Sequence, residues 1–235
     1  MIIYGKNAVV EALKNKRNIS KIYLANEQMK ETVWGYNKNI EIVMMPMNQM
    51  NNRFKGNHQG IVAESSADYQ YTPLNELINN NCDRTNVCFA MLDGLEDPHN
   101  LGAILRTADA TGIEGIIIPK NRSVSLNETV AKVSTGAIEH VKVAQVTNLV
   151  ATLKDLKKAG YWVIGLEMEG SVDYKTQDYL GKIVVIIGSE GKGISRLVKE
   201  ECDFLVNIPM VGHVTSLNAS VSASILFYEV LRNRG

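Results

Sequence analysis

The C-terminal part of the sequence is dominated by short, strongly apolar segments that alternate with helical patterns. Six such segments occur, at Val87–Leu92, Gly115–Ile118, Val141–Val143, Trp162–Ile164, Ile183–Ile187 and Phe204–Val206. Strands that are apolar on both faces are typical of parallel sheets covered by helices on each side. A helix over 148–159 and a final helix over about 217–232 are expected to cover this sheet. The pattern therefore predicts an α/β fold.

The first 64 residues show a separate and smaller alternation of helices and strands. Helices are expected around residues 8–13 and 26–37 and after Pro46, with strands at Ile22–Leu24, Glu41–Met44 and Gly60–Ala63. Residues 65–86 have weak periodicity and a single expected helical turn at Leu74–Ile78. We therefore expect a small α/β domain at 1–64, a linker at 65–86 and a larger domain at 87–235.

The charge is balanced overall but distributed unevenly. The 235 residues contain 25 Lys and Arg and 25 Asp and Glu, yet residues 1–60 hold nine basic and four acidic side chains. Phosphate contacts supply most of the non-specific affinity for nucleic acid, so a basic N-terminal domain suits a polyanionic partner. Ordinary solvated surface charge explains the same imbalance equally well.

Other features of the sequence favour a cytoplasmic location and exclude a membrane span. The longest apolar runs are far shorter than the roughly 20 residues that cross a bilayer, and the N-terminus lacks the layout of a secretory signal. Three scattered cysteines, Cys82, Cys88 and Cys202, form no C-x-x-C pair or even set, which is typical of a reducing compartment. No metal-binding motif is expected.

Three polar, glycine-containing segments lie beside the apolar ones, at 93–108, 186–195 and 208–222. They place uncommon polar side chains where a strand meets a loop or helix, which is where open α/β sheets bind ligands. In the first, Asn100 is expected to cap a helix whose second turn carries Arg106. The second, GSEGKG, has neither P-loop nor G-x-G-x-x-G spacing. In the third, Ser216 is a candidate helix cap followed by Asn218 in the first turn.

Together and in this order, the three segments resemble the motifs of the SpoU (TrmH-like) family of RNA ribose 2′-O-methyltransferases, in the SPOUT class. These enzymes use S-adenosylmethionine (AdoMet). The stretches YGKNAVVEAL and HQGIVAE in residues 1–64 are similar to that family's N-terminal substrate-binding domain, related to a ribosomal-protein RNA-binding module. The likeness is greatest to the bacterial subgroup that methylates a guanosine ribose in 23S large-subunit rRNA.

The resemblance implies specific roles for residues of the three motifs. It implies that the catalytic centre contains Asn100, Arg106, Glu190, Ser216 and Asn218. It implies that Gly188, Ile208 and Leu217 contact AdoMet, largely through backbone groups. It further implies a C-terminal trefoil knot and a homodimer. Ser189 departs from the family pattern, because many relatives have Asn there, but the neighbouring residues are kept.

RNA contacts are expected from basic residues of the N-terminal domain, which are Lys6, Lys14, Lys16, Arg17, Lys21, Arg53 and Lys55. The family's proposed base is Arg106, but a guanidinium group stays charged near neutral pH. We expect instead that Arg106 holds a phosphate and stabilises the developing alkoxide. Two alternatives remain open: a tRNA ribose methyltransferase with the same catalytic residues, and a non-catalytic RNA-binding or ribosome-assembly factor that does not bind AdoMet.

Overall fold

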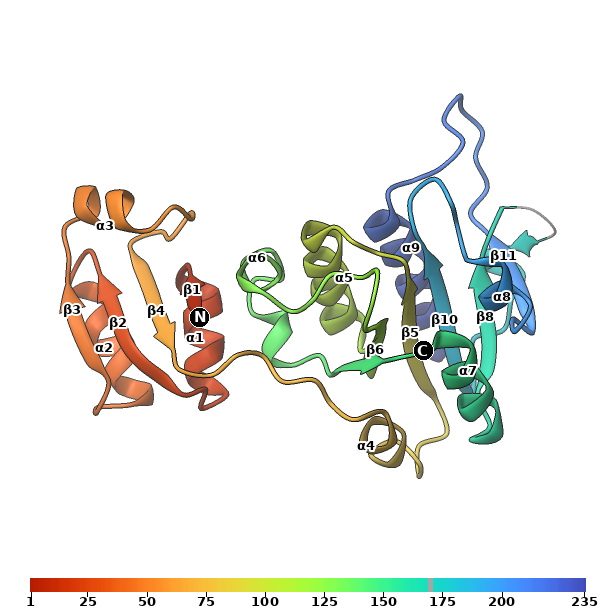
Figure 1. Cartoon of the computed structure of the whole chain (residues 1–235), viewed down its shortest axis with the longest axis horizontal. Coiled ribbons are helices and arrows are strands. Elements are labelled where there is room, and N and C mark those ends of the chain that lie inside the picture. Colours follow the sequence, from red (N-terminus) through yellow and green to blue (C-terminus); the bar gives the residue numbers. More distant parts are fainter. Residues whose placement is uncertain (169–170) are drawn as a thin grey trace. The chain divides into compact units, whose positions relative to one another are not determined.

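The computed structural model describes residues 1–168 and 171–235, which form two compact units (Figure 1). Unit 1 comprises Met1–Gln70 and Leu126–His140, and unit 2 comprises Tyr71–Ser125 and Val141–Gly235. The sequence did not suggest that the second of these stretches, Leu126–His140, packs with the N-terminal residues. In the described residues, no helix is long and apolar enough to span a membrane.

Unit 2 is built on a parallel sheet. Its described residues form seven strands in the order β7-β6-β5-β10-β8-β11-β9, and every neighbouring pair is parallel. The strands are β5 (Val87–Asp93), β6 (Gly115–Pro119), β7 (Val143–Val146), β8 (Trp162–Leu166), β9 (Val172–Asp173), β10 (Lys182–Gly188) and β11 (Phe204–Asn207). The predicted α/β fold with a parallel sheet is confirmed.

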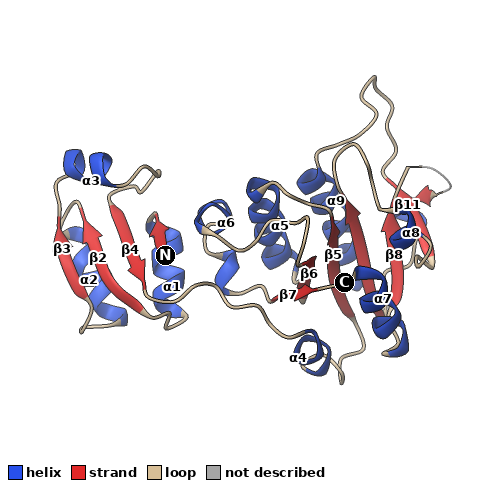
Figure 2. Cartoon of the chain, viewed as in Figure 1, coloured by secondary structure: helices blue, strands red, loops and turns tan. Residues whose placement is uncertain are grey.

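Helices cover both faces of this sheet, as the apolar strands require (Figure 2). One layer contains α4 (Leu74–Asn79), α7 (Leu149–Lys158) and α8 (Arg196–Lys199), whose leucines and valines share a core cluster with alternate residues of β5 and β10. In that cluster the Phe89 ring stacks on Tyr161 at 5.0 Å. The helices α5 (Pro98–Thr111) and α9 (Ala219–Arg234) pack against each other in the opposite layer.

Two elements of unit 2 start two residues later than predicted. The strand expected at Val141–Val143 begins at Val143, because only from there does the chain pair with β6, in the register Ile116 to Val143. The last helix begins at Ala219 and not at residue 217, because the Asn218 side chain caps it. The predicted linker contains the short helix α4, close to the turn expected at Leu74–Ile78.

Unit 1 has its own mixed sheet. In the described part of the chain its strands are ordered β1-β4-β2-β3, with β2 and β3 parallel and the other pairs antiparallel. They are β1 (Ile2–Tyr4), β2 (Ile19–Leu24), β3 (Glu41–Met44) and β4 (Ile61–Ser65). The helices α1 (Lys6–Lys14) and α2 (Gln28–Tyr36) pack on one face, and α3 (Met47–Arg53) packs on the other.

The stretch Leu126–His140 supplies α6 (Glu128–Val133) and a short 3₁₀ helix, Ala137–Glu139, to unit 1. Arg17 Nη1 lies 3.4 Å from Glu139 Oε1, and both side chains are about one tenth exposed (10% and 8%). The Arg17 guanidinium also stacks over the Tyr69 ring at 3.8 Å. Burial raises the pKa of Glu139, and the nearby Arg17 charge opposes this rise. This buried pair therefore ties the two stretches of unit 1 together.

Replacing Arg17 with Met should destabilise unit 1 by about 3 kcal/mol, because a buried carboxylate loses its partner. The folded state already holds the Glu139 pKa above its ordinary value. The loss should therefore be largest above that pKa and shrink as the pH falls and Glu139 is protonated. Urea unfolding at several pH values measures both effects. Lys6→Met, at an exposed position of α1, is the control and should change stability little.

Candidate active site

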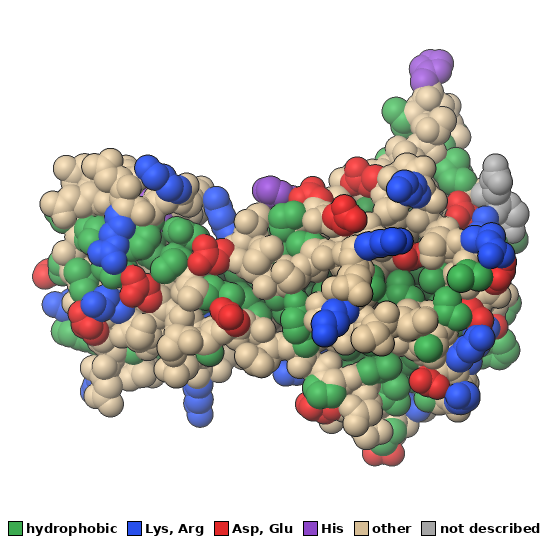
Figure 3. Space-filling model, viewed as in Figure 1, with side chains coloured by type: hydrophobic (Ala, Val, Ile, Leu, Met, Phe, Trp, Pro, Cys, Tyr) green, Lys and Arg blue, Asp and Glu red, His purple; other side chains and the backbone are tan. Residues whose placement is uncertain are grey.

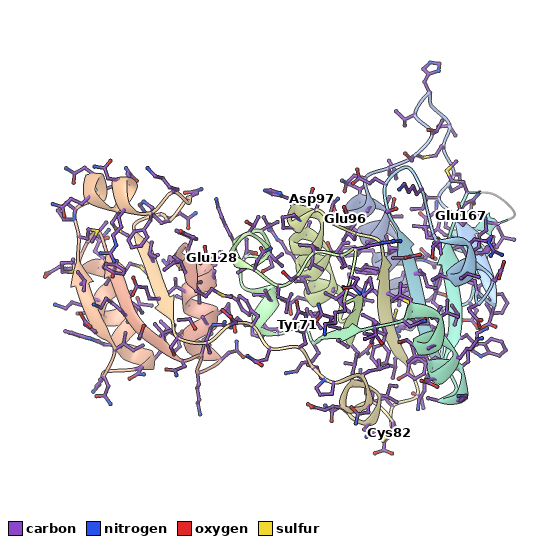
Figure 4. All side chains as sticks on the ribbon, in the orientation of Figure 1. Tyr71, Cys82, Glu96, Asp97, Glu128 and Glu167 are labelled. Carbon is purple, nitrogen blue, oxygen red and sulfur yellow. The ribbon has the colours of Figure 1, made fainter. Side chains whose placement is uncertain are left out.

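A cavity of about 340 Å³ lies at the carboxyl ends of the parallel strands of unit 2. Its wall is formed by the loops that follow β8, β10 and β11. Such an edge is where open α/β sheets bind ligands, and the volume is in the range of small-molecule sites. Figure 4 places the labelled Glu167 at this edge, together with Glu96 and Asp97 near the start of α5, and Cys82 at the opposite end of the unit.

The first motif begins α5, with a different cap from the one expected. Asp97 is the N-cap: its carboxylate accepts a hydrogen bond from the His99 backbone N–H at 2.8 Å, and Pro98 occupies the first helical position. This hydrogen bond lowers the pKa of Asp97. The expectation that Asn100 caps the helix is wrong, because the cap and the start of the helix lie three residues earlier. Arg106 consequently lies in the third turn, not the second.

With the capping role taken by Asp97, the Asn100 side chain is free to bond elsewhere. It is buried, at 7% exposure, and its Nδ2 donates to Glu190 Oε1 at 2.9 Å. Asn218 Nδ2 donates to the same carboxylate oxygen at 2.6 Å and to Asn100 Oδ1 at 2.9 Å. These three side chains, one from each motif, form a single hydrogen-bonded cluster. We call it the amide–carboxylate cluster.

Asn218 has a second role as the N-cap of α9. Its Oδ1 accepts hydrogen bonds from the backbone N–H groups of Ser220 at 2.9 Å and Val221 at 3.4 Å. The candidate cap Ser216 is therefore replaced by Asn218, two residues further on. One amide thus uses its oxygen to start the helix and its nitrogen to hold Glu190, so the position of α9 and the position of the carboxylate are coupled.

The second motif forms a tight loop after β10. Ser189 and Gly193 exchange backbone hydrogen bonds, N–H to O, at 3.1 and 2.9 Å. The loop requires glycine at Gly188, where an added Cβ would lie 2.1 Å from the Gly193 carbonyl carbon. Gly191 and Gly193 have φ of 79° and 64°, which other residues rarely adopt. Because Ser189 contributes its backbone to this turn, the departure from Asn at that position leaves the turn intact.

The structure brings most of the expected site residues to one place. Gly188, Glu190, Ile208, Ser216 and Leu217 line the cavity. Asn100 and Asn218 reach its edge through their bonds to Glu190.

Arg106 is different. It is exposed, it does not line the cavity, and its side chain has no hydrogen bond or ion pair within residues 1–168 and 171–235. Its guanidinium is therefore available to a ligand.

Several polar residues of the cavity wall were not anticipated, among them Glu167, Lys192, Asn207 and Thr215. Lys192 lies inside the glycine loop, and Thr215 directly precedes Ser216, so their proximity to the motifs could have indicated them. Glu167 and Asn207 follow β8 and β11. Only the general rule that strand ends carry ligands points to these two residues.

The basic residues expected to contact RNA are in different situations in unit 1. Lys6, Lys16 and Lys55 are exposed and have no ion pair among the described residues. Lys14 and Lys21 pair with Glu11 and Glu41, and Arg53 with Glu64, at 2.7, 2.9 and 3.5 Å.

Arg17 is unsuited to bind RNA, because its guanidinium is buried against Glu139 and Tyr69. On the visible face, basic and acidic side chains are interspersed without one continuous basic patch (Figure 3).

The chain matches two family models. Residues 88–228 match the SpoU rRNA Methylase family, and residues 2–71 match the model described as RNA 2′-O ribose methyltransferase substrate binding. The first match contains all three motifs and the cavity. The second covers the part of unit 1 that lies at the N-terminus.

Similar proteins cover the whole chain or a large part of it. YacO of Bacillus subtilis, assigned to the TrmH family of tRNA/rRNA methyltransferases, is 47% identical over 99% of this chain and 95% of its own length. The crystal structure of the SpoU methyltransferase AviRb from Streptomyces viridochromogenes has a TM-score of 0.82, with 20% identity, over 100% of this chain and 89% of that one. The TrmH/SpoU tRNA modifying enzyme of A. aeolicus, 29% identical, covers 68% of this chain and 82% of its own, with a TM-score of 0.59.

Two variants of Asn218 should separate its capping role from its role in the amide–carboxylate cluster. Asn218→Ala removes both the cap and the hydrogen bonds to Glu190 and Asn100, and it should cost about 2 kcal/mol. Asn218→Asp keeps the capping acceptor but places a second carboxylate beside Glu190, at a position now 2.6 Å from Oε1. Like charges so close destabilise the folded state. The loss of stability in Asn218→Asp should therefore exceed that in Asn218→Ala at pH 8 and shrink as acid protonates one carboxyl. Thermal unfolding from pH 4 to 8 tests this; parallel pH profiles would contradict it.

Proposed function

The chain belongs to the SpoU rRNA methylase family of AdoMet-dependent RNA methyltransferases, and we propose that it methylates the ribose 2′-hydroxyl of a guanosine in 23S large-subunit rRNA. The observation that carries the proposal is the convergence of the three motifs on one cavity through the amide–carboxylate cluster. The target nucleotide class comes from the likeness of the N-terminal stretches to one subgroup of the family.

The cavity suits AdoMet in size and chemistry. Apolar side chains of Leu166, Ile187, Ile208 and Leu217 form part of its wall, and serine, threonine and carboxylate groups supply polar contacts. We propose that Gly188, Ile208 and Leu217 hold the adenosine part, mainly through backbone groups that the glycine turn leaves accessible. When bound, AdoMet supplies an activated methyl group. The protein's own task is then to position the ribose hydroxyl and assist the loss of its proton.

The proposed catalytic residues divide this task. Glu190, Asn100 and Asn218 form one fixed hydrogen-bonded unit at the cavity edge, and preorganised polar groups of this kind need no rearrangement during the reaction. Ser216, on the loop that lines the cavity and leads into α9, would contact the nucleotide or hold that loop. Because both Asn100 and Asn218 donate to Glu190, its carboxylate is held in one orientation.

Arg106 is proposed to bind the phosphate of the target nucleotide and to stabilise the alkoxide that develops on the ribose. Its side chain is exposed and unpaired within the described residues, as a phosphate ligand requires. A guanidinium offers a rigid fork of donors that matches phosphate geometry. Since this group stays charged at neutral pH, the ribose proton would pass to water late in the reaction and not to Arg106.

RNA affinity is proposed to come from unit 1, through Lys6, Lys14, Lys16, Lys21, Arg53 and Lys55. Arg17 is left out because it is buried. The functional division proposed is an RNA-binding domain at 1–64, a linker at 65–86 and a methyltransferase domain at 87–235. The solved tRNA modifying enzyme covers only 68% of this chain, so about a third of it has no counterpart there. This extra part supports rRNA over tRNA as the substrate.

We further propose that the protein is a cytoplasmic homodimer whose C-terminal domain contains a trefoil knot. The family resemblance supports the dimer and the knot. The three cysteines form no disulfide among the described residues, which supports a reducing compartment.

The substrate is tested by incubating the protein and methyl-labelled AdoMet with unmodified large-subunit rRNA and, separately, with bulk tRNA. We expect label on a single guanosine ribose of the rRNA, located by mapping the modified nucleotide. Label confined to tRNA would contradict the proposed substrate but keep the chemistry. If AdoMet does not bind at all, a non-catalytic RNA-binding role would replace the proposal.

The role of Arg106 is tested by single-turnover methyl transfer. Arg106→Met should slow transfer by about 100-fold or more, because a donor to the developing charge is lost. Arg106→Lys should recover only a small part, because lysine keeps the charge but not the planar fork. AdoMet affinity should be unchanged in both. Arg232→Lys, near the C-terminal end of α9, is the matched control, and near-wild-type rates in Arg106→Lys would refute bidentate phosphate binding.

A further inference from the structure

Glu167 is a carboxylate of the cavity wall that none of the three motifs includes. It directly follows β8 and lines the cavity together with the glycine loop. Its side chain is 17% exposed, which leaves the carboxylate mostly sheltered from water. A sheltered carboxylate that faces a ligand cavity needs donors to satisfy it.

The sheet register places Glu167 between the two strand ends that carry the proposed adenosine contacts. β8 pairs with β10 as Gly165 to Ile186, so two residues further on Glu167 comes beside Gly188. On the other side, the Glu167 N–H donates to the Val206 carbonyl at 2.9 Å, in the strand that leads to Ile208. The cavity wall at this point therefore runs from Gly188 through Glu167 to Ile208.

The carboxylate retains free acceptor capacity. Oε1 accepts one hydrogen bond, from the Met168 N–H at 2.9 Å. Oε2 lies 3.7 Å from Lys199 Nζ, and a Cβ on Gly193 would be 3.1 Å from it. The carboxylate thus lies against the glycine loop, held by these neighbours. Because an ionised carboxyl offers about four acceptor positions, most of them are unused by the described residues.

From this placement we propose that Glu167 accepts hydrogen bonds from the 2′- and 3′-hydroxyls of the cofactor's own ribose. The inference rests on the proposed AdoMet site, because it requires adenosine between Gly188 and Ile208. A ribose diol presents two adjacent donors, which match the two oxygens of one carboxylate. An acidic residue fulfils the same role toward the ribose in dinucleotide-binding α/β folds.

Two observations favour the diol over the ammonium group of AdoMet as the partner of Glu167. The Lys199 ammonium already offsets the charge of this carboxylate, so a second cation gains less than it would at an isolated anion. In addition, the sheet register places Glu167 beside Gly188, and its N–H bonds to the strand that leads to Ile208, so it lies among the residues proposed for adenosine. Neutral hydroxyl donors fit both its charge and its position.

The test measures binding, by calorimetry, of S-adenosylhomocysteine and of its 2′-deoxy and 3′-deoxy analogues to the full-length protein. Wild-type protein should lose about 10- to 100-fold in affinity when either hydroxyl is removed, as for a hydrogen bond to a charged group. Glu167→Gln should bind S-adenosylhomocysteine about 10- to 100-fold more weakly and should lose little more on removal of a hydroxyl. If the carboxylate and the hydroxyls are in direct contact, removing either one loses the same interaction, so the two losses do not add.

Two control variants separate contact from general damage to the cavity wall. Glu201→Gln removes a carboxylate of similar exposure (20%) that pairs with Lys154 and does not line the cavity, and it should bind all three ligands as wild type does. Lys199→Met keeps the Glu167 carboxylate and should keep the discrimination between ligands with and without the diol.

Several outcomes would overturn the inference. If Glu167→Gln discriminates against the deoxy analogues as strongly as wild type, the carboxylate does not touch the diol. Equal affinity of wild-type protein for all three ligands overturns it without any variant, so a poorly folding mutant leaves the test valid. If wild-type protein binds none of them, the proposed AdoMet site itself fails, and the inference fails with it.

Discussion

The amide of Asn218 is the interaction on which the arrangement of the site depends. Its oxygen caps α9 and its nitrogen holds Glu190 and Asn100. Each of these partners comes from a different part of the chain: the helix after β5, the loop after β10 and the helix after β11. Separately, each contact contributes only about a kilocalorie per mole. Their importance lies in the geometry, because one planar amide sets the relative positions of three motifs whose linked residues are 28, 90 and 118 residues apart in sequence.

The parallel sheet makes this convergence possible. All its strands end at the same edge, so loops that are distant in sequence become neighbours there. The close approach of Gly188 to the Gly193 backbone turns the loop after β10 back at once. Glu190 therefore lies over the strand ends and within reach of the two asparagines. The apolar strands thus have two effects: they bury the core, and they place polar residues at a common boundary.

Much of the fold was predictable because it depends on patterns that are local in sequence. The strands at Glu41–Met44 and Ile183–Ile187 are marked by short apolar runs, and the structure has them at or within one residue of the expected bounds. Features that depend on distant partners were not predictable. Asparagine is a residue type that often caps helices, yet Asp97 and not Asn100 caps this one. An arginine such as Arg17 is usually a surface residue, yet this one is buried against Glu139, which is over 120 residues away in sequence. For the same reason Glu167 became a candidate only once the register was known.

Unit 1 is assembled from two separate stretches of the chain, and this affects how it folds during synthesis. It consists of the first 70 residues and of Leu126–His140, so the polypeptide passes between the units three times. During synthesis, the N-terminal sheet leaves the ribosome long before the segment that pairs with Arg17. Until residue 139 emerges, that arginine has no carboxylate to receive it. The N-terminal unit can therefore complete its packing only after more than half of the polypeptide has been translated. Because unit 1 is discontinuous in sequence, recombination cannot transfer the whole unit between genes as one continuous segment without also carrying the part of unit 2 that lies between its two stretches.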